Sequence, residues 1–283
     1  MTASRVATVL SPADNTRIFA ANRASGHVVA RVEAAGGGTR RRHIREDGSL
    51  RVRFPHCEHA ALEAVIVNTA GGMAGGDRFG ISLAVGTGAS LIAGTAAAEK
   101  VYRSNGPASE VALTLTVEDG GRLAWLPQET ILFDRARLSR RIDIDIAEGA
   151  CLVLAEALVF GRAAMGETVE QGFLADRWRL RRGGRLVFAE SARLEGAIAE
   201  KLARPAVAAG GIAIATVLVA PGNEATLAAV RALEAIFAGE VGISAWNGIA
   251  VARLCARDGA ALRHDLIALL AALKQPLPRL WTN

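Results

Sequence analysis

The chain has 283 residues, of which 51% are hydrophobic and 22% charged, a composition that predicts a well-packed globular protein. No apolar run approaches the roughly 20 residues of a membrane-spanning helix, so we expect no membrane partner. The first 17 residues lack the apolar stretch of a secretion signal. Cys57, Cys151 and Cys255 are odd in number and scattered, which predicts free thiols in a reducing compartment, the cytoplasm.

The net charge of +5 and the sequence pI of about 9.7 raise the question of nucleic-acid binding. The run Arg40–Arg42 is expected in a glycine-rich turn. Five further arginines surround an expected hairpin turn at Gly183-Gly184: Arg177, Arg179, Arg181, Arg182 and Arg185. Aromatic residues make up only 5% of the chain, and none is interleaved with these arginines as a base-stacking platform requires. We therefore expect no nucleic-acid partner, and a solvated face or a docking surface for an acidic protein instead.

The segment His56-Cys57-Glu58-His59 is the one obvious group of soft metal ligands in the sequence. The side chains of His56, Cys57 and His59 are too few and too adjacent for a closed site, and a strand would turn Cys57 away from His56. Two interpretations stay open: a weak metal contact, or a loop that leads into the strand beginning at Leu62.

A glycine-rich segment joins two predicted strands, 62–67 and 79–85. Its key residues are Asn68, Thr69, Gly71, Gly72, Gly75, Gly76 and Asp77. A Walker loop needs Lys-Ser/Thr after its last glycine, whereas Asp-Arg stands here, and a dinucleotide loop must open into a helix. The segment therefore predicts a connection with backbone conformations that glycine adopts easily, and Asp77 at its end either caps the loop's amides or faces an internal passage.

The middle of the chain repeats one pattern, an apolar residue, a glycine-centred turn and a leucine. The units are Val85–Leu91, Val117–Leu123, Ile146–Leu152 and Leu180–Leu186. Alternating strands flank each turn, and the turns are expected to be hairpin-like. Units of this kind bury a face only by stacking on their neighbours. We therefore predict a mainly β fold of stacked sheets, as in an irregular β-helix or an elongated sandwich.

Each repeat carries a glutamate after its turn: Glu99, Glu129, Glu156 and Glu190. Stacking of the units predicts a column of carboxylates along one side of the fold. One interpretation is a structural lattice in which each glutamate pairs with a neighbouring arginine. The other is an acidic path that passes a cation from layer to layer, since carboxylate oxygens bind such ions only moderately.

Two α-helices are predicted near the C-terminus. Asn223 is the expected N-cap of a helix over 224–238, and Asp258 precedes a helix over 260–275 that Pro276 ends. A buried strand is expected over 206–220, and Trp281 in the tail is expected to be tied down or used in docking. The sequence contains neither a G-x-S-x-G motif nor a Cys-His pair with supporting spacing, so we expect no enzyme activity.

Four segments carry a resemblance to a known family. They are 68–79, 97–104 (Ala-Ala-Glu-Lys-Val-Tyr-Arg-Ser), 125–134 (Trp-Leu-Pro-Gln-Glu-Thr-Ile-Leu-Phe-Asp) and 277–281 (Leu-Pro-Arg-Leu-Trp). In order and spacing the chain resembles the UreD (UreH) family of urease accessory proteins over nearly its whole length, which implies a single domain over 1–283. Phe79 replaces the leucine that is usual in the family.

The resemblance implies a mostly β fold with two helices and a role in urease maturation. The implied partners are apo-urease, the F-type accessory protein and, through it, the G-type GTPase, with nickel conducted through an internal channel and no stably bound cofactor. The candidate nickel path is Asp77, Glu99, Glu129, Asp134 and Glu156, and further motif residues are Tyr102, Arg103 and Gln128. The alternative is an enzyme or ligand-binding β-protein that uses the Gly-Gly-Asp loop as an anion or metal site.

Overall fold

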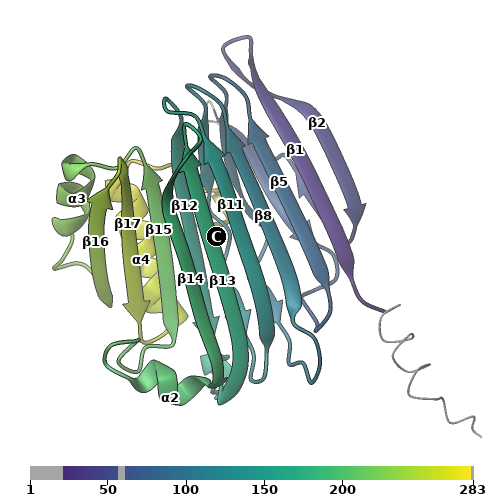
Figure 1. Cartoon of the computed structure of the whole chain (residues 1–283), viewed down its shortest axis with the longest axis vertical. Helices are drawn as coiled ribbons and strands as arrows, with labels where there is room; N and C mark the ends of the chain where they lie inside the picture. The colour runs from purple at the N-terminus through teal and green to yellow at the C-terminus, as the bar shows by residue number, and fades with distance from the viewer. Residues whose placement is uncertain (1–21, 57–60, 282–283) are drawn as a thin grey trace, which may run out of the picture.

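A computed structural model describes residues 22–56 and 61–281, which form two β-sheets stacked face to face (Figure 1). The first sheet has, in sheet order, β14 (Arg185–Ala197), β13 (Gln171–Arg182), β11 (Arg137–Ile146), β8 (Ser109–Val117), β5 (Arg78–Val85), β1 (Ser25–Ala35) and β2 (Gly38–Gly48). The main path of the second sheet is β16 (Glu240–Trp246), β17 (Ile249–Ala256), β15 (Ala213–Ala220), β12 (Cys151–Phe160), β9 (Arg122–Trp125), β6 (Ser90–Thr95), β4 (Leu62–Asn68) and β3 (Leu50–Arg53). Two short strands, β10 (Thr130–Leu132) and β7 (Glu99–Val101), continue it beside β12.

Successive passes of the chain alternate between the two sheets and lie parallel to one another. In the first sheet β5, β8, β11 and β13 are parallel neighbours, and in the second β4, β6, β9 and β12 are. The leucines that follow the first three glycine turns, Leu91, Leu123 and Leu152, pair across the second sheet in one row, which Leu62 of β4 continues. The predicted stacking of repeated units is therefore confirmed, as a coiled, solenoid-like arrangement.

The prediction of hairpin-like turns is wrong for the first three units. Their turns connect a strand of the first sheet to a strand of the second, because each unit lies parallel to the next, as the pairing of Val85 with Val117 shows. Only the fourth turn, at Gly183-Gly184, makes a hairpin, between β13 and β14. There Leu180 pairs with Ile144 rather than with Ile146, so the fourth unit is offset by two residues.

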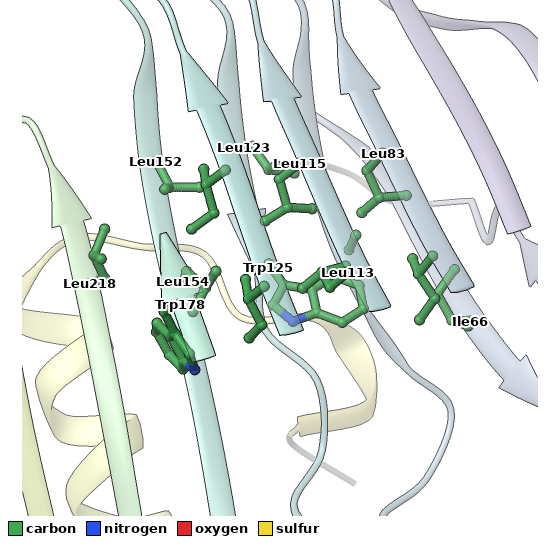
Figure 2. Packing of buried hydrophobic residues seen from close by; sticks show 14 of the residues in the cluster. Ile66, Leu83, Leu113, Leu115, Leu123, Trp125, Leu152, Leu154, Trp178 and Leu218 are labelled. Carbon is green, nitrogen blue, oxygen red and sulfur yellow. The ribbon is translucent and has the colours of Figure 1, made fainter. Parts of the chain in front are cut away.

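The main hydrophobic core fills the space between the sheets (Figure 2). Strand alternation builds it: in β5, Phe79, Ile81, Leu83 and Val85 are buried, with less buried small residues between them. Leu115 and Leu123 show the same alternation on the strands that face each other (Figure 2). A second core covers the outer face of the second sheet, where α4 packs on β15 and β17.

Helices differ from the predicted ones mainly in length. The α-helices are α2 (Ile198–Ala203), α3 (Glu224–Arg231) and α4 (Gly259–Ala272), with short 3-10 turns η1 (Ala163–Met165) and η2 (Arg279–Trp281). Asn223 caps α3 through a reciprocal pair of bonds with Thr226, but the helix ends at Arg231 instead of 238. Asp258, predicted to precede the last helix, caps α4, which ends at Ala272 instead of 275. Helix α2 was not predicted, and the buried strand begins at Ala213 instead of 206.

Two further features bear on the surface of the molecule. The run Arg40–Arg42 lies within the exposed edge strand β2 and not in a turn. Within the described ranges, no helix is both long enough and apolar enough to cross a membrane.

Candidate functional site

An internal cavity of about 60 Å³ lies between the two sheets. Its apolar lining includes Ile66, Phe79, Leu113 and Trp125. Its polar lining consists of Asn68, Thr95, Glu99, Gln128, Thr130, Arg140 and Glu156. A cavity of this size has room for a few water molecules or a small ion, and its polar groups set it apart from the main hydrophobic core beside it.

The cavity forms where the ladder between β6 and β9 is interrupted. The Leu126 N–H still donates to Ala93 O at 2.7 Å, but the Gln128 N–H donates to the side-chain oxygen of Thr95 at 3.0 Å. Gly94 makes this path possible, because a Cβ at that position would lie 2.4 Å from Leu126 O. The sheet resumes only at β7 and β10, and the polar side chains of the interruption face the gap.

The glycine-rich segment closes over one end of this cavity and is fixed by Asn68. The Asn68 Nδ2 donates to Gly72 O at 3.2 Å and to Glu99 Oε2 at 3.1 Å. Gly72 has φ +143°, and a Cβ there would lie 2.6 Å from the Tyr102 ring and 2.8 Å from Lys100 O. Tyr102 donates from its hydroxyl to Gly71 O at 2.8 Å. The motif residues therefore hold the segment tightly against β7.

Asp77 is 4% exposed and lies outside the lining of the cavity. Its Oδ1 accepts from the Ala24 N–H at 2.8 Å and its Oδ2 from the Ala74 N–H at 2.7 Å. Of the two interpretations of Asp77, this geometry matches the capping of backbone amides. Because both oxygens already accept such bonds, the structure offers no support for an anion or metal site in the Gly-Gly-Asp loop.

Glu99 and Glu156 are the two path candidates that line the cavity. Burial raises the pKa of the Glu99 carboxyl, which the hydrogen bond from Asn68 only partly offsets. Burial also raises the pKa of Glu156, against the opposing effect of the Arg140 charge. Glu156 accepts from Trp125 Nε1 at 2.7 Å and from the Arg140 guanidinium. Glu156 is buried and Glu99 is partly buried, and in both carboxyls the partial loss of water disfavours the charged form.

Arg140 joins Glu156 to a further buried carboxylate, Asp176. Its Nε and Nη2 donate to the two Asp176 oxygens at 3.0 and 2.6 Å. The three residues are 6%, 7% and 6% exposed for Arg140, Glu156 and Asp176. Burial lowers the pKa of Arg140, but the charges of Asp176 and Glu156 outweigh this and raise it, so the guanidinium stays charged.

Arg140 and Asp176 were missed from the sequence, although a signal for them exists. Arg140 stands between Leu138 and Ile142 at an inward-facing position of β11, and Asp176 has the same place in β13. A charged residue in the apolar register of an alternating strand indicates a buried, paired charge. Register then places the two opposite each other, since Arg140 pairs with Asp176 across the parallel strands.

The other path candidates lie elsewhere. Glu129 Oε1 accepts from Arg263 of α4 at 2.9 Å, and Asp134 Oδ1 accepts from the Gln171 N–H at 3.0 Å. Glu190 pairs with Arg253. The four repeat glutamates therefore do not form one column, because Glu99 and Glu129 follow the interruption of the second sheet, Glu156 lies within β12, and Glu190 lies in β14 of the first sheet. Arg103 forms an isolated antiparallel bridge with Ala136 and does not line the cavity.

The remaining metal candidates were His56, Cys57 and His59. His56 is described, and its carbonyl accepts from Arg279 at 3.4 Å, whereas Cys57 and His59 lie outside the described residues. In the described part of the chain, no group of three His, Cys, Asp or Glu side chains is close enough to hold a metal ion.

The C-terminal motif seals the outer side of the interrupted sheet. Gln128 lines the cavity and also donates from Nε2 to Leu280 O at 2.8 Å. Trp281 is buried and donates from Nε1 to Leu126 O at 2.9 Å, while Arg263 donates to Trp281 O at 2.9 Å. These bonds fix the C-terminal tail to the rest of the fold, which matches the first of the two interpretations of Trp281, a tail that is tied down.

A second, larger groove of about 660 Å³ lies beside the cavity. Strands β13 and β14 line one side of it, and β12, β15, β16 and β17 line the other. Its polar lining includes Asp176, Glu190, Thr216 and Arg253, and Arg140 and Glu156 line both the groove and the cavity. The ion cluster thus stands at the wall between the two spaces.

The sequence matches known proteins over almost its full length. The profile of one family, described as UreD urease accessory protein, matches residues 24–282. Relatives named urease accessory protein UreD occur in Rhodopseudomonas palustris strain HaA2, 59% identical over 95% of this chain and 97% of that protein, and in Bradyrhizobium diazoefficiens strain USDA 110, 59% identical over 94% and 96%. Urease accessory protein UreD 3 of Bradyrhizobium sp. strain BTAi1 is 57% identical over 94% and 96%.

Proposed function

The chain belongs to the UreD family of urease accessory proteins, and we propose that it is a non-catalytic maturation factor that docks on apo-urease and passes nickel toward the urease active site. The observation that carries this proposal is the cavity between the sheets. There Glu99 and Glu156 bring two carboxylates to a space bordered by residues of the main hydrophobic core. Removing such groups from water is costly unless they are paired. Glu156 is buried and paired with Arg140, whereas Glu99 is partly buried and forms no salt bridge among the described residues.

The lining of the cavity suits the passage of a divalent cation better than its storage. Asn68, Thr95, Gln128 and Thr130 surround the carboxylates with neutral polar groups. Oxygen ligands of this kind bind Ni²⁺ only moderately, and no imidazole or thiolate lines the cavity to hold it firmly. The cation is cargo in this scheme, bound in passing and released, and the protein holds no resident cofactor.

The proposed path is narrower than the one expected from the sequence. It keeps Glu99 and Glu156, which line the cavity. Asp77 supports the path indirectly by fixing the glycine-rich segment. Glu129 and Asp134 hold α4 and the start of β13 in place, respectively.

We extend the proposal to a complex with the F-type accessory protein and, through it, the G-type GTPase that supplies the nickel. None of the helices in the described part of the chain lies over the outer face of the first sheet (Figure 1), and Arg177, Arg179 and Arg181 are exposed there on β13. On the neighbouring strand β11, Asp143 and Asp145 lie opposite Arg179 and Arg181, so this face carries charges of both signs and suits docking of a protein surface of complementary charge. Nucleic acid is not part of the proposal.

The experiment compares cells that express a urease gene cluster with and without this chain. We expect urease purified from cells without the chain to be nickel-poor and inactive, and the chain to co-purify with apo-urease when present. Nickel is measured by mass spectrometry of the purified urease, alongside activity. Urease that is fully loaded in both strains would overturn the proposal.

A further inference from the structure

The inner cavity and the outer groove meet at a single charged wall. Arg140 and Glu156 line both spaces, whereas Asp176 lines only the groove. Glu156 and the Arg140 guanidinium are therefore the groups that a cation meets if it leaves the cavity on this side. We propose that Arg140 is the gating residue of the nickel path, an inference that rests on the proposed function and deepens it.

The charge of Arg140 makes it a barrier. A guanidinium stays protonated at every pH that proteins experience, and its repulsion of a divalent cation is strong in a poorly solvated interior. While Arg140 is bound to Glu156, it also occupies an oxygen that the cation would use. When Arg140 is bound to Glu156, it therefore fills the space between the cavity and the groove and also occupies the Glu156 oxygen that would bind the cation.

The two carboxylates hold Arg140 in different ways, which makes the barrier reversible. Asp176 receives two parallel bonds, from Nε and Nη2, whereas Glu156 receives one, from Nη1. Glu156 also keeps its bond from Trp125 if Arg140 moves away. Asp176 is thus the anchor of the guanidinium, and Glu156 is the partner that it can exchange for a passing cation.

Stability alone gives no reason for this cluster. A buried ion pair or triad can often be replaced by well-packed apolar side chains without loss of stability, because desolvation offsets the attraction of the charges. Strands β11 and β13 supply apolar residues at the neighbouring inward positions, such as Ile142 and Leu174. The charges stand only at the wall between the cavity and the groove, which is where a gate would act.

Two variants test the gate in opposite directions. The double variant Arg140→Met with Asp176→Leu removes the barrier and its anchor but keeps Glu156. We expect nickel to reach apo-urease on the order of tenfold faster in the purified complex, as for a lowered barrier. Asp176→Asn keeps Arg140 and leaves Glu156 as its only charged partner, so we expect transfer several-fold slower than in the unaltered chain.

Folding is checked by circular dichroism and by co-purification with apo-urease, and Arg140→Lys is the control that keeps a cation at the wall. If both test variants fold and transfer nickel at the unaltered rate, Arg140 is no gate although the proposed function stands. If the double variant misfolds, the rate with Asp176→Asn decides the question alone. If urease loads equally well without the chain, the proposed function fails instead.

Discussion

The space between the two sheets has an apolar half and a polar half, built from the same strands. In the first sheet one row of paired inward residues is aliphatic throughout: Ala30, Leu83, Leu115, Ile144 and Leu180. A second row of paired inward residues lies four positions earlier in β5, β8, β11 and β13. It consists of Phe79, Val111, Arg140 and Asp176. Strand alternation points the side chains of both rows inward. The inward orientation alone therefore does not decide whether a position packs in the core or lines the cavity.

The comparison shows how one fold separates stability from use. The apolar row packs against Leu91, Leu123 and Leu152 of the second sheet, whose strands are continuous there. The polar row faces the interruption after Thr95, where the cavity lies. We infer that the apolar half supplies most of the buried apolar surface that stabilises the fold. The polar half contributes less of this stability because its side chains line the proposed passage.

The largest effect on stability is expected at Arg140. Arg140→Met leaves Glu156 and Asp176 buried without their cation, so the free energy of unfolding should fall by about 3–5 kcal/mol. A matched variant that adds Glu156→Gln and Asp176→Asn removes all three charges and should recover most of the loss. Urea denaturation measures both. Equal losses would show that packing, and not charge, governs this row.

A leucine pair compares the two halves directly. Leu115→Ala in the apolar half should lower the free energy of unfolding by about 2–5 kcal/mol, because the neighbours cannot fill the space. Leu113→Ala should lower it less, since Leu113 already borders the cavity and the new space is shared with polar groups. Thr114→Ala, exposed between them, is the control. A greater loss at Leu113 than at Leu115 would contradict the division into halves.

The glycine-rich segment offers a second matched pair. Gly71→Ala meets no atom within 4 Å and faces only the strain of φ +76°, a loss of about 1–2 kcal/mol. Gly72→Ala adds contacts of 2.6 Å with Tyr102 and 2.8 Å with Lys100 O, so its loss should exceed that of Gly71→Ala. Thermal unfolding of the two variants measures the difference. Similar melting temperatures would mean that the segment is not held on β7 as described.

The smallest effect concerns the ionisation of Glu99. Burial raises the folded-state pKa of the Glu99 carboxyl above its ordinary value of 4.5. The stability that the protonated carboxyl contributes is therefore present below pH 4.5 and is lost as the pH rises through the folded-state pKa. The Glu99→Gln variant has no carboxyl to ionise, so it does not lose stability in this pH range. Its side-chain oxygen can still accept the hydrogen bond from Asn68. The variant should therefore gain stability over the unaltered chain near pH 7, and the gain should disappear below pH about 4.5. A gain that persists in acid would rule out the proposed cause.

Much of the architecture was predictable because it depends on local pattern. Alternation in 79–85 and the caps Asn223 and Asp258 act within a few residues, and the structure confirms them. The turns were mistaken for hairpins because a glycine turn has the same local chemistry whether the next strand pairs with its predecessor or joins the other sheet.

The candidate site was predictable only in part. Glu99 and Glu156 were identified from the repeat, but Glu129 was not separated from them, since the direction of a side chain at a strand end depends on the interruption near Gln128. Arg140 meets Asp176 only through the register of parallel strands 36 residues apart. No local pattern carries that pairing.

The most direct test of the polar half is the nickel content of urease matured with Glu99→Gln and, separately, with Glu129→Gln. Both changes remove one carboxylate charge, but only Glu99 lines the cavity. We predict that Glu99→Gln lowers the nickel content while the complex with apo-urease still assembles, and that Glu129→Gln leaves the content close to that of the unaltered chain. Full loading with Glu99→Gln, or a loss confined to Glu129→Gln, would contradict passage through this cavity.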